Sequence, residues 1–165
     1  MRWPPPSSRS RTRPPPTRAW TGARPGSCTR RCDMNRDMYE VGTSREVRAF
    51  HTMPGMPPPE GERHSHDYRL DIRVTRPRLD ERDMVVDLDV LNDALRGVTD
   101  RLHEADLDEI VGKETGKDAV TVEVFSQWLH AVLAGAVGAV AGATLHVRVW
   151  EDPQMYGGYE GPLGD

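Results

Sequence analysis

The clearest pattern along the chain is a two-residue alternation of apolar and charged positions over 64–75. Such alternation places one set of side chains on a buried sheet face and the other set in solvent, so it predicts a strand. Shorter alternations predict a strand or a bulged pair of strands over 39–50, with Gly42 as the bulge point, and a last strand over 145–150. The segment 84–87 is typical of a short returning strand.

Two further segments have apolar residues every three or four positions, which predicts amphipathic helices. Asp87 or Asp89 can cap the first helix, and the second begins near Thr121. The expected buried positions are Leu88, Leu91, Leu95, Val98 and Leu102 in the first helix and Val122, Phe125, Leu129 and Val132 in the second, with Trp128 at its edge.

The order strand, strand, strand, helix, helix, strand favours an α+β fold, in which an antiparallel sheet carries both helices on one face. The Pro- and Gly-rich segment 53–61 is expected to be a loop. The apolar run 131–143 is too short to cross a bilayer. We interpret it as a helix end and a connection, and expect no membrane association.

Charge divides the chain into two parts. Residues 1–33 contain eight arginines and one acidic residue, whereas the net charge of the whole chain is -4, so the remainder is strongly acidic. An acidic body lacks the basic face of nucleic-acid binders, so we expect no nucleic-acid partner. We predict a disordered Arg- and Pro-rich extension over 1–37 and one globular domain over 38–165.

The extension has three interpretations: a basic tail that binds an anion, a transit peptide, or upstream sequence read from a misplaced start. Met34 and Met38 are later starts just before regular structure, and we favour the third interpretation. Cys28 and Cys32 are the chain's two cysteines and both lie in the extension. The predicted domain therefore has no disulfide, and we expect a cytoplasmic protein.

Three histidines are candidate metal ligands. His64 and His66 lie two positions apart at the start of a strand, so their side chains point to one side of the sheet. His51 ends the preceding strand, and an antiparallel return would bring it beside the pair. Three imidazoles with an open fourth position suit a catalytic zinc ion. On spacing alone, exposed histidines at loop edges are the more ordinary interpretation.

Five segments, in order and at matching intervals, resemble the signature blocks of the 6-pyruvoyl/6-carboxy-tetrahydropterin synthase family. They are 47–51 (VRAFH), 64–68 (HSHDY), 84–88 (MVVDL), 120–123 (VTVE) and 149–151 (VWE). The resemblance implies the tunnelling fold, a four-stranded antiparallel sheet with two helices on one face that assembles into trimers or hexamers. It also implies that the three histidines bind zinc and that the active site is built at a subunit interface.

The resemblance further implies a pterin site. Glu151 matches the glutamate that anchors the pterin ring, a role that suits a carboxylate accepting two hydrogen bonds from a planar edge. Thr121 and Glu123 match a block that lines the same pocket, although Val120 stands where proline is usual. Thr121 also fits a helix cap, Glu123 a favourable charge in the first turn, and Glu151 a solvated strand end.

Two departures affect the expected catalytic groups. Glu60 occupies the position of the family's usual cysteine, and it also fits an exposed acid in a loop. Leu102-His103-Glu104 replaces the usual Leu-Asp-His, so the Asp-His dyad becomes a His-Glu pair; a one-residue slip would instead make His103 the family histidine. Ser65 replaces a glycine between the two histidines, a minor change.

We therefore expect a zinc-dependent lyase that converts 7,8-dihydroneopterin triphosphate to 6-carboxytetrahydropterin, for deazapurine (queuosine) synthesis, or to a related C6-modified pterin. One alternative is side-chain cleavage to 6-hydroxymethyl-dihydropterin, which some divergent family members with glutamate in place of cysteine perform. The other is a catalytically inactive zinc- and pterin-binding homologue. Candidates for phosphate binding, by charge alone, are Arg63, Arg69 and Lys113.

Overall fold

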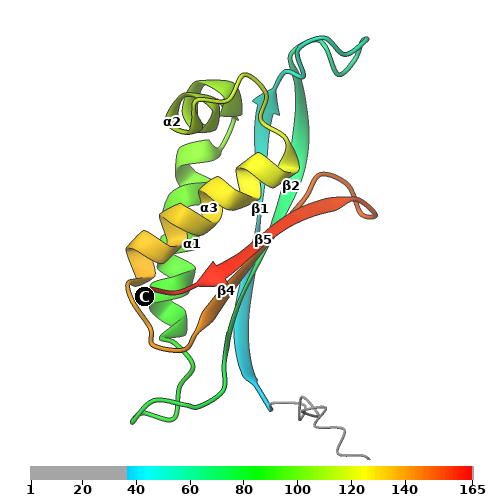
Figure 1. The fold of residues 1–165 in the computed structure, drawn as a ribbon. Coiled ribbons are helices and arrows are strands. Elements are labelled where there is room, and N and C mark those ends of the chain that lie inside the picture. The colour runs from blue at the N-terminus through cyan, green and yellow to red at the C-terminus, as the bar shows by residue number, and fades with distance from the viewer. Residues whose placement is uncertain (1–36, 165) are drawn as a thin grey trace, which may run out of the picture. The chain divides into compact units, whose positions relative to one another are not determined.

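Five strands form one mixed sheet in the order β3-β1-β2-β4-β5 (Figure 1). The structure is a computed structural model and describes residues 37–164, so the predicted extension lies almost wholly outside the described residues. The strands are β1 (Tyr39–His51), β2 (His64–Arg76), β3 (Ala105–Asp106), β4 (Thr144–Trp150) and β5 (Tyr156–Pro162).

Strands β1 and β2 form a long antiparallel hairpin in continuous register, from the pair Tyr39 and Arg76 to the pair His51 and His64. The expected bulge at Gly42 is therefore wrong. Its Cβ would lie 2.6 Å from a backbone oxygen of β2, and glycine instead allows this close approach within a regular ladder. The four long strands are antiparallel as predicted. The two-residue β3 adds a parallel pairing at the end of β1.

The helices all lie on one face of the sheet, in front of it in Figure 1. The two long ones are α1 (Leu88–Leu102) and α3 (Val122–Val137). Asp87 caps α1 by accepting from the Asp89 amide, and Thr121 caps α3 by accepting from the Val124 amide. A π-helical turn, η1 (Asp108–Gly112), and the short α2 (Lys113–Thr115) connect them. No helix among residues 37–164 has the length and apolarity needed to span a membrane.

The core fills the space between the sheet and the two long helices. The apolar positions of β2 are buried as the alternation predicts, and they meet the buried leucines of α1 and the aromatic face of α3. Among the residues that pack most completely are Tyr68, Leu70, Leu91, Leu95, Phe125, Leu129, Leu133 and Leu145. Each such side chain contributes about 1.5–3 kcal/mol through burial, so this layer fixes β2 against the helices.

Three details of the prediction are wrong. Residues 84–87 form no strand; Val85 and Val86 are buried without sheet pairing as the chain enters α1. The glycine-rich segment after the predicted last strand forms a further strand, β5. Leu88 of α1 is 43% exposed, and in α3 Leu133 is buried where Val132 was expected. In both helices the buried face is rotated slightly from the face that the spacing of apolar residues predicts.

Candidate active site

The β1–β2 hairpin gathers the three predicted histidines at one end. His51 lies opposite His64 in the register, and His66 follows two positions along β2. The ring centroids are 4.5 Å apart for His51 and His64, 5.2 Å for His51 and His66, and 4.9 Å for His64 and His66. The period of the strand therefore places all three imidazoles together, as the sequence predicted.

Hydrogen bonds set the orientation of two of these rings. Nδ1 of His51 lies 3.0 Å from the carbonyl oxygen of Val120, and Nδ1 of His64 lies 2.8 Å from the carbonyl oxygen of Glu62. A carbonyl only accepts, so each Nδ1 is the protonated nitrogen and each Nε2 keeps its lone pair. The Nε2 atoms of all three histidines are buried and form no hydrogen bond. Buried polar atoms are normally paired, so this trio fits a metal ion as its common partner.

Glu60 completes the cluster. Its Oε2 lies 3.0 Å from Nε2 of His64, although the two groups are not aligned as a hydrogen bond. One potential ligand atom from each of Glu60 and the three histidines falls within 4.8 Å of the others. Glu60 lies on the loop that joins β1 and β2, and a 2.9 Å hydrogen bond from the Met53 amide to the Glu60 carbonyl closes this loop. Three imidazoles and one carboxylate are a donor set that suits zinc.

The surroundings of the histidine cluster favour the uncharged forms of His51 and Tyr68. Burial lowers the pKa of His51, an effect partly opposed by its hydrogen bond to Val120. Burial raises the pKa of Tyr68, whose ring packs edge-on to His51, and the Glu151, Asp108 and Glu60 carboxylates raise it further. Neutral imidazoles are the form that binds a metal. The lowered pKa of His51 therefore favours the metal-binding form of this one ligand.

A gap in the sheet opens beside the cluster. The pairing of β4 with β2 stops at Trp150 and Arg69, whereas β2 continues to His64. A cavity of about 430 Å³ fills this gap, and a second of about 170 Å³ lies toward the loop that joins β1 and β2. Glu151 lines both cavities. His66 lines the larger cavity and His51 the smaller one.

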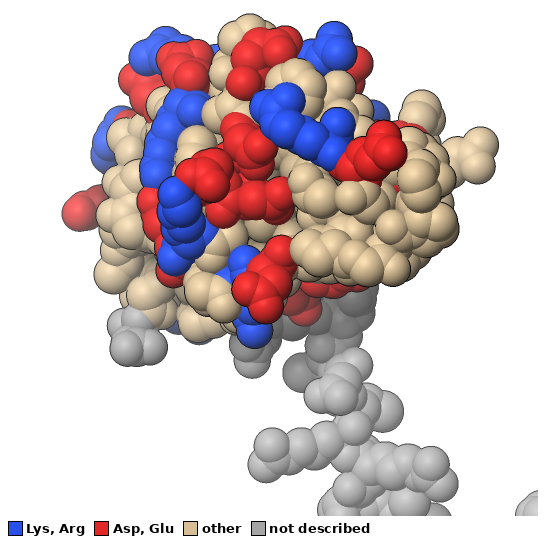
Figure 2. Space-filling view, turned by 90° about the horizontal axis from the view of Figure 1, so that it is seen from above, with Lys and Arg blue, Asp and Glu red and all other residues tan. Residues whose placement is uncertain are grey.

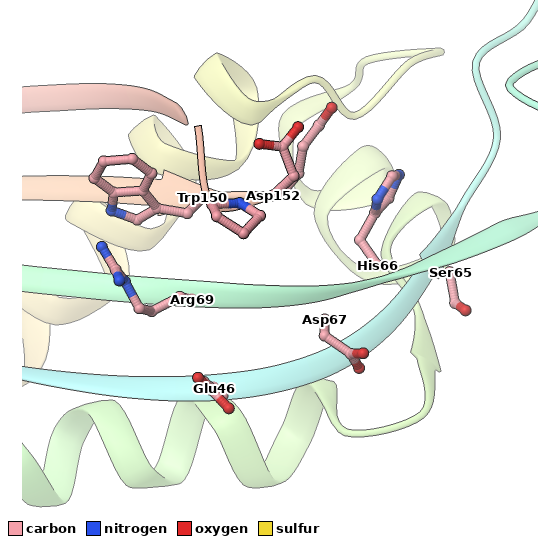
Figure 3. Close-up of a pocket in the computed structure, with 9 residues that line it drawn as sticks. Glu46, Ser65, His66, Asp67, Arg69, Trp150 and Asp152 are labelled. Carbon is pink, nitrogen blue, oxygen red and sulfur yellow. The ribbon is translucent and has the colours of Figure 1, made fainter. Parts of the chain in front are cut away.

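The larger cavity has an aromatic edge (Figure 3). Trp150 donates from its indole nitrogen to Asp71 at 2.7 Å, and the guanidinium of Arg69 lies 4.6 Å from the centre of the indole ring. Tyr156 stacks nearby, with ring centroids 4.5 Å apart. These contacts hold the end of β4, which carries Glu151 as its next residue, at a fixed place beside His66.

The structure brings six of the nine predicted site residues together. The three histidines and Glu60 form the cluster, and Glu151 and Thr121 line the smaller cavity with His51 and Glu60. Glu123 lies exposed in the first turn of α3 and lines neither cavity, which agrees with the alternative of a helix-terminus charge. Thr121 both caps α3 and lines the smaller cavity, while its expected contact with a substrate stays a prediction.

His103 and Glu104 lie apart from the cluster within one chain. They are exposed and line a hollow of about 370 Å³ with Arg48, on the sheet face opposite the helices, and this hollow shares Glu46 and Asp67 with the larger cavity. The Glu104 amide donates to the Arg48 carbonyl at 2.8 Å, and the two side chains approach to 3.8 Å. Directly after them, β3 pairs with the end of β1, at the edge of the sheet.

Sequence reasoning missed the groups that support the ligands. Oδ2 of Asp108 accepts from the Thr52 amide at 2.9 Å, next to His51, and Oδ1 is buried without a partner. Burial raises the pKa of this carboxyl. The sequence analysis assigns no role to Asp108. The carbonyls of Val120 and Glu62 carry no side-chain signal, so no residue pattern could have identified them.

Comparison with known proteins decides the family. The family model described as 6-pyruvoyl tetrahydropterin synthase matches residues 40–162. The chain belongs to the 6-pyruvoyl tetrahydropterin synthase family. A comparison with curated protein sequences gives no significant match. Members of this family are lyases of pterin metabolism, so the cluster and its cavities lie in a pterin-synthase-like domain.

Solved structures support the same fold at low sequence identity. The 6-pyruvoyl tetrahydropterin synthase of Caenorhabditis elegans aligns with a TM-score of 0.60 and 17% identity, over 76% of this chain and 96% of that chain. The Plasmodium falciparum enzyme aligns with a TM-score of 0.60 and 12% identity, over 76% and 98%. A Plasmodium vivax variant, in which a catalytic glutamate is changed to alanine, aligns with a TM-score of 0.60 and 12% identity, over 76% and 99%.

Proposed function

We propose that this chain is a zinc-dependent lyase that acts on the C6 side chain of a 7,8-dihydroneopterin and cleaves it to 6-hydroxymethyl-dihydropterin. The observation that carries the proposal is the position of Glu60. Its carboxylate lies against His64, within the set of four potential ligand atoms, where the family's usual cysteine would stand. The glutamate named as catalytic in the Plasmodium vivax structure supports this assignment.

Each residue of the cluster has a definite task in this reaction. Glu151, between the two cavities, would accept hydrogen bonds from the amino and N–H edge of the pterin. His51, His64 and His66 would hold the metal, which when bound makes nearby side-chain hydroxyls more acidic. Glu60 would then take the proton of the C2′ hydroxyl.

Loss of that proton breaks the bond between C1′ and C2′. The C2′ oxygen becomes an aldehyde, the bonding pair passes into the C6–N5 unit of the ring, and C1′ then receives the proton that Glu60 carries. The products are 6-hydroxymethyl-dihydropterin and glycolaldehyde, which together contain all atoms of the substrate. The step involves no net oxidation or reduction, so it needs one carboxylate base and no further reagent.

Formation of 6-carboxytetrahydropterin, the product expected first from the sequence, is the second candidate. It needs more proton transfers than one carboxylate supplies, and His103 and Glu104 are the expected second pair. Their place beside β3, at the sheet edge, supports a role in the site of a neighbouring copy. Within residues 37–164, the stretch Tyr39–Arg48 of β1 has a strand partner on one side only, and so does β5. Both edges can therefore pair with further copies. This supports the expected homotrimer or homohexamer.

The test is the variant Glu60→Gln, with Glu62→Gln as its control on the same loop. We expect E60Q to retain stoichiometric zinc and pterin binding but to lose turnover by about 10²–10⁴-fold, the usual contribution of a general base. E62Q removes an exposed charge and should leave turnover near that of the wild type. The products are identified by mass spectrometry, with and without a chelator.

Each outcome has a distinct meaning. Glycolaldehyde and the hydroxymethyl pterin support the proposed cleavage, whereas a carboxy pterin identifies the second candidate. An E60Q protein as active as the wild type removes Glu60 from the mechanism. A wild-type protein that binds zinc and pterin but forms no product would be the inactive binding homologue.

A further inference from the structure

Glu60 lies on the loop of residues 52–63, which projects from the end of the β1–β2 hairpin (Figure 1). Contacts within the loop tie it to itself. The Met53 amide donates to the Glu60 carbonyl at 2.9 Å. A Cβ at Gly61 would lie 1.9 Å from the Met56 carbonyl oxygen, so the chain folds closely at this glycine. The placement of Glu60 therefore depends on how the two ends of the loop are held.

Asp108 holds the first end of the loop. Its Oδ2 accepts from the Thr52 amide at 2.9 Å, a contact between residues 56 positions apart in the chain. The next amide along the chain is that of Met53, which donates to Glu60. A shift of the Thr52 peptide would therefore pass through one residue to the backbone of Glu60.

Asp106 holds the second end. Its Oδ2 accepts from Nε of Arg63, the last residue of the loop, at 2.9 Å, and its Oδ1 accepts from the Asp108 amide at 3.1 Å. Asp106 also pairs with Phe50 in the β1–β3 ladder, which fixes it to the sheet. One carboxylate thus joins the far end of the loop to the residue that holds the near end. Figure 2 shows this end of the molecule from above, where acidic side chains lie beside basic ones.

The two contacts differ in how much they can contribute. The side chains of Arg63 and Asp106 are 52% and 25% exposed, and ion pairs open to water contribute little. The hydrogen bond from Thr52 to Asp108 is partly buried. A buried amide that loses its acceptor is costly, so the loop would move to find another partner. Asp108 is therefore the more important of the two.

We propose that Asp108, assisted by Asp106, is a positioning residue that keeps the Glu60 carboxylate beside His64 and within reach of the reacting side chain. This inference rests on the proposed function, in which Glu60 is the base. The three histidines lie on β1 and β2, and Glu151 follows β4, so none of them belongs to the loop. Release of the loop should therefore lower kcat and leave zinc content and KM unchanged.

The experiment compares Asp108→Ala with Asp108→Asn in the assembled, zinc-loaded protein. Asparagine keeps an oxygen that can accept from the Thr52 amide, whereas alanine has none. We expect D108A to lower kcat by about 10–10²-fold, as a misplaced catalytic group does, and D108N to retain most of the wild-type kcat. Both variants lack the carboxylate charge, so rescue by asparagine assigns the effect to the hydrogen bond.

Asp80 provides a matched control. Its Oδ1 accepts from the Arg82 and Met84 amides, each at 2.9 Å, in the connection that follows the other end of β2. Asp80→Ala removes the same kind of contact from a loop away from the histidines. D80A should lower the melting temperature and leave kcat unchanged.

Amide hydrogen exchange measures the hold on the loop without turnover. Residues 52–60 should exchange faster in D108A than in D108N or the wild type, with zinc and without it. Asp106→Ala is a second variant if D108A does not fold. It should lower kcat less than D108A, because its ion pair is more open to water, and it should also retain zinc. Wild-type kcat and wild-type exchange in D106A would then contradict the proposal.

The outcomes separate this inference from the proposed function. Wild-type kcat in D108A, or a D108N protein as slow as D108A, would overturn the inference. Loss of zinc from both variants would overturn it too and would assign Asp108 to the metal site through its charge. An inactive E60Q beside a fully active D108A leaves the lyase function standing. An E60Q as active as the wild type, or a wild type without turnover, overturns both together.

Discussion

Gly157 offers a strict test of how Glu151, the proposed pterin anchor, is positioned. It lies in β5 opposite Val149, two residues before Glu151 along β4. A Cβ added at Gly157 would lie 2.6 Å from Cγ2 of Val122 and 3.0 Å from its Cβ and backbone carbon. Because part of that contact is backbone at the start of α3, a rotamer change alone cannot relieve it.

The change Gly157→Ala should therefore destabilise the domain. Overpacking of this kind costs about 1–3 kcal/mol, and for a domain of this size each kcal/mol lowers the melting temperature by roughly 3–5 °C. We expect a fall of roughly 3–15 °C in thermal unfolding. The displaced hairpin also carries Glu151, so affinity for the pterin should fall together with stability.

The matched control is Gly135→Ala, the same chemical change within α3. A Cβ there meets no atom within 4 Å, and alanine is favoured over glycine in a helix by about 0.5–1 kcal/mol. G135A should raise the melting temperature and leave pterin affinity unchanged. An unfolding midpoint for G157A equal to that of the wild type would refute the reasoning, since β5 would then move freely away from α3.

Two further predictions concern the metal and pH. His66→Ala should abolish stoichiometric zinc binding measured by atomic absorption, whereas His103→Ala should retain it. In the wild type, free zinc at 100 times its dissociation constant should stabilise the fold by about 2.7 kcal/mol. A chelator should remove this gain. Hydrogen bonds from Arg101 and Trp128 lower the pKa of Glu114 below its ordinary 4.5, so they stabilise the fold above pH 4.5 and this contribution disappears as pH falls through the lowered pKa. Urea unfolding from pH 3 to 6 should show that slope in the wild type and a shallower one in Glu114→Gln; identical slopes would contradict it.

The periodic parts of the fold could be predicted from the sequence, because burial on one face leaves a regular pattern. Strand β2 and both long helices follow such patterns. Strand β5 could not be predicted, since its three glycines carry no apolar alternation. They serve close contacts instead, Gly157 and Gly161 with α3 and Gly158 with β4. The strand predicted over 84–87 was wrong because its valines are buried by packing against the core. Apolar residues alone do not show that a segment pairs with a neighbouring strand.

The candidate site likewise has residues that the sequence could identify and supporting contacts that it could not. The three histidines could be placed together from the two-residue period of β2 and the antiparallel return of β1. Glu60 could be added from the family resemblance. The supporting contacts come from carbonyls and from Asp108, whose place depends on a π-helical turn that no pattern predicted. His103 and Glu104 could be named from the sequence, but their relation to the cluster depends on contacts beyond one chain.

The hydrogen bond from His51 to Val120 has a mechanical consequence. Val120 directly precedes Thr121, the cap of α3, so the imidazole ring is linked through one peptide unit to the start of that helix. A rotation of the ring must therefore move the first turn of α3 or break the bond. A metal ion bound at His51 would therefore act on the first turn of α3, and amide hydrogen exchange in that turn would report the state of His51 from a distance.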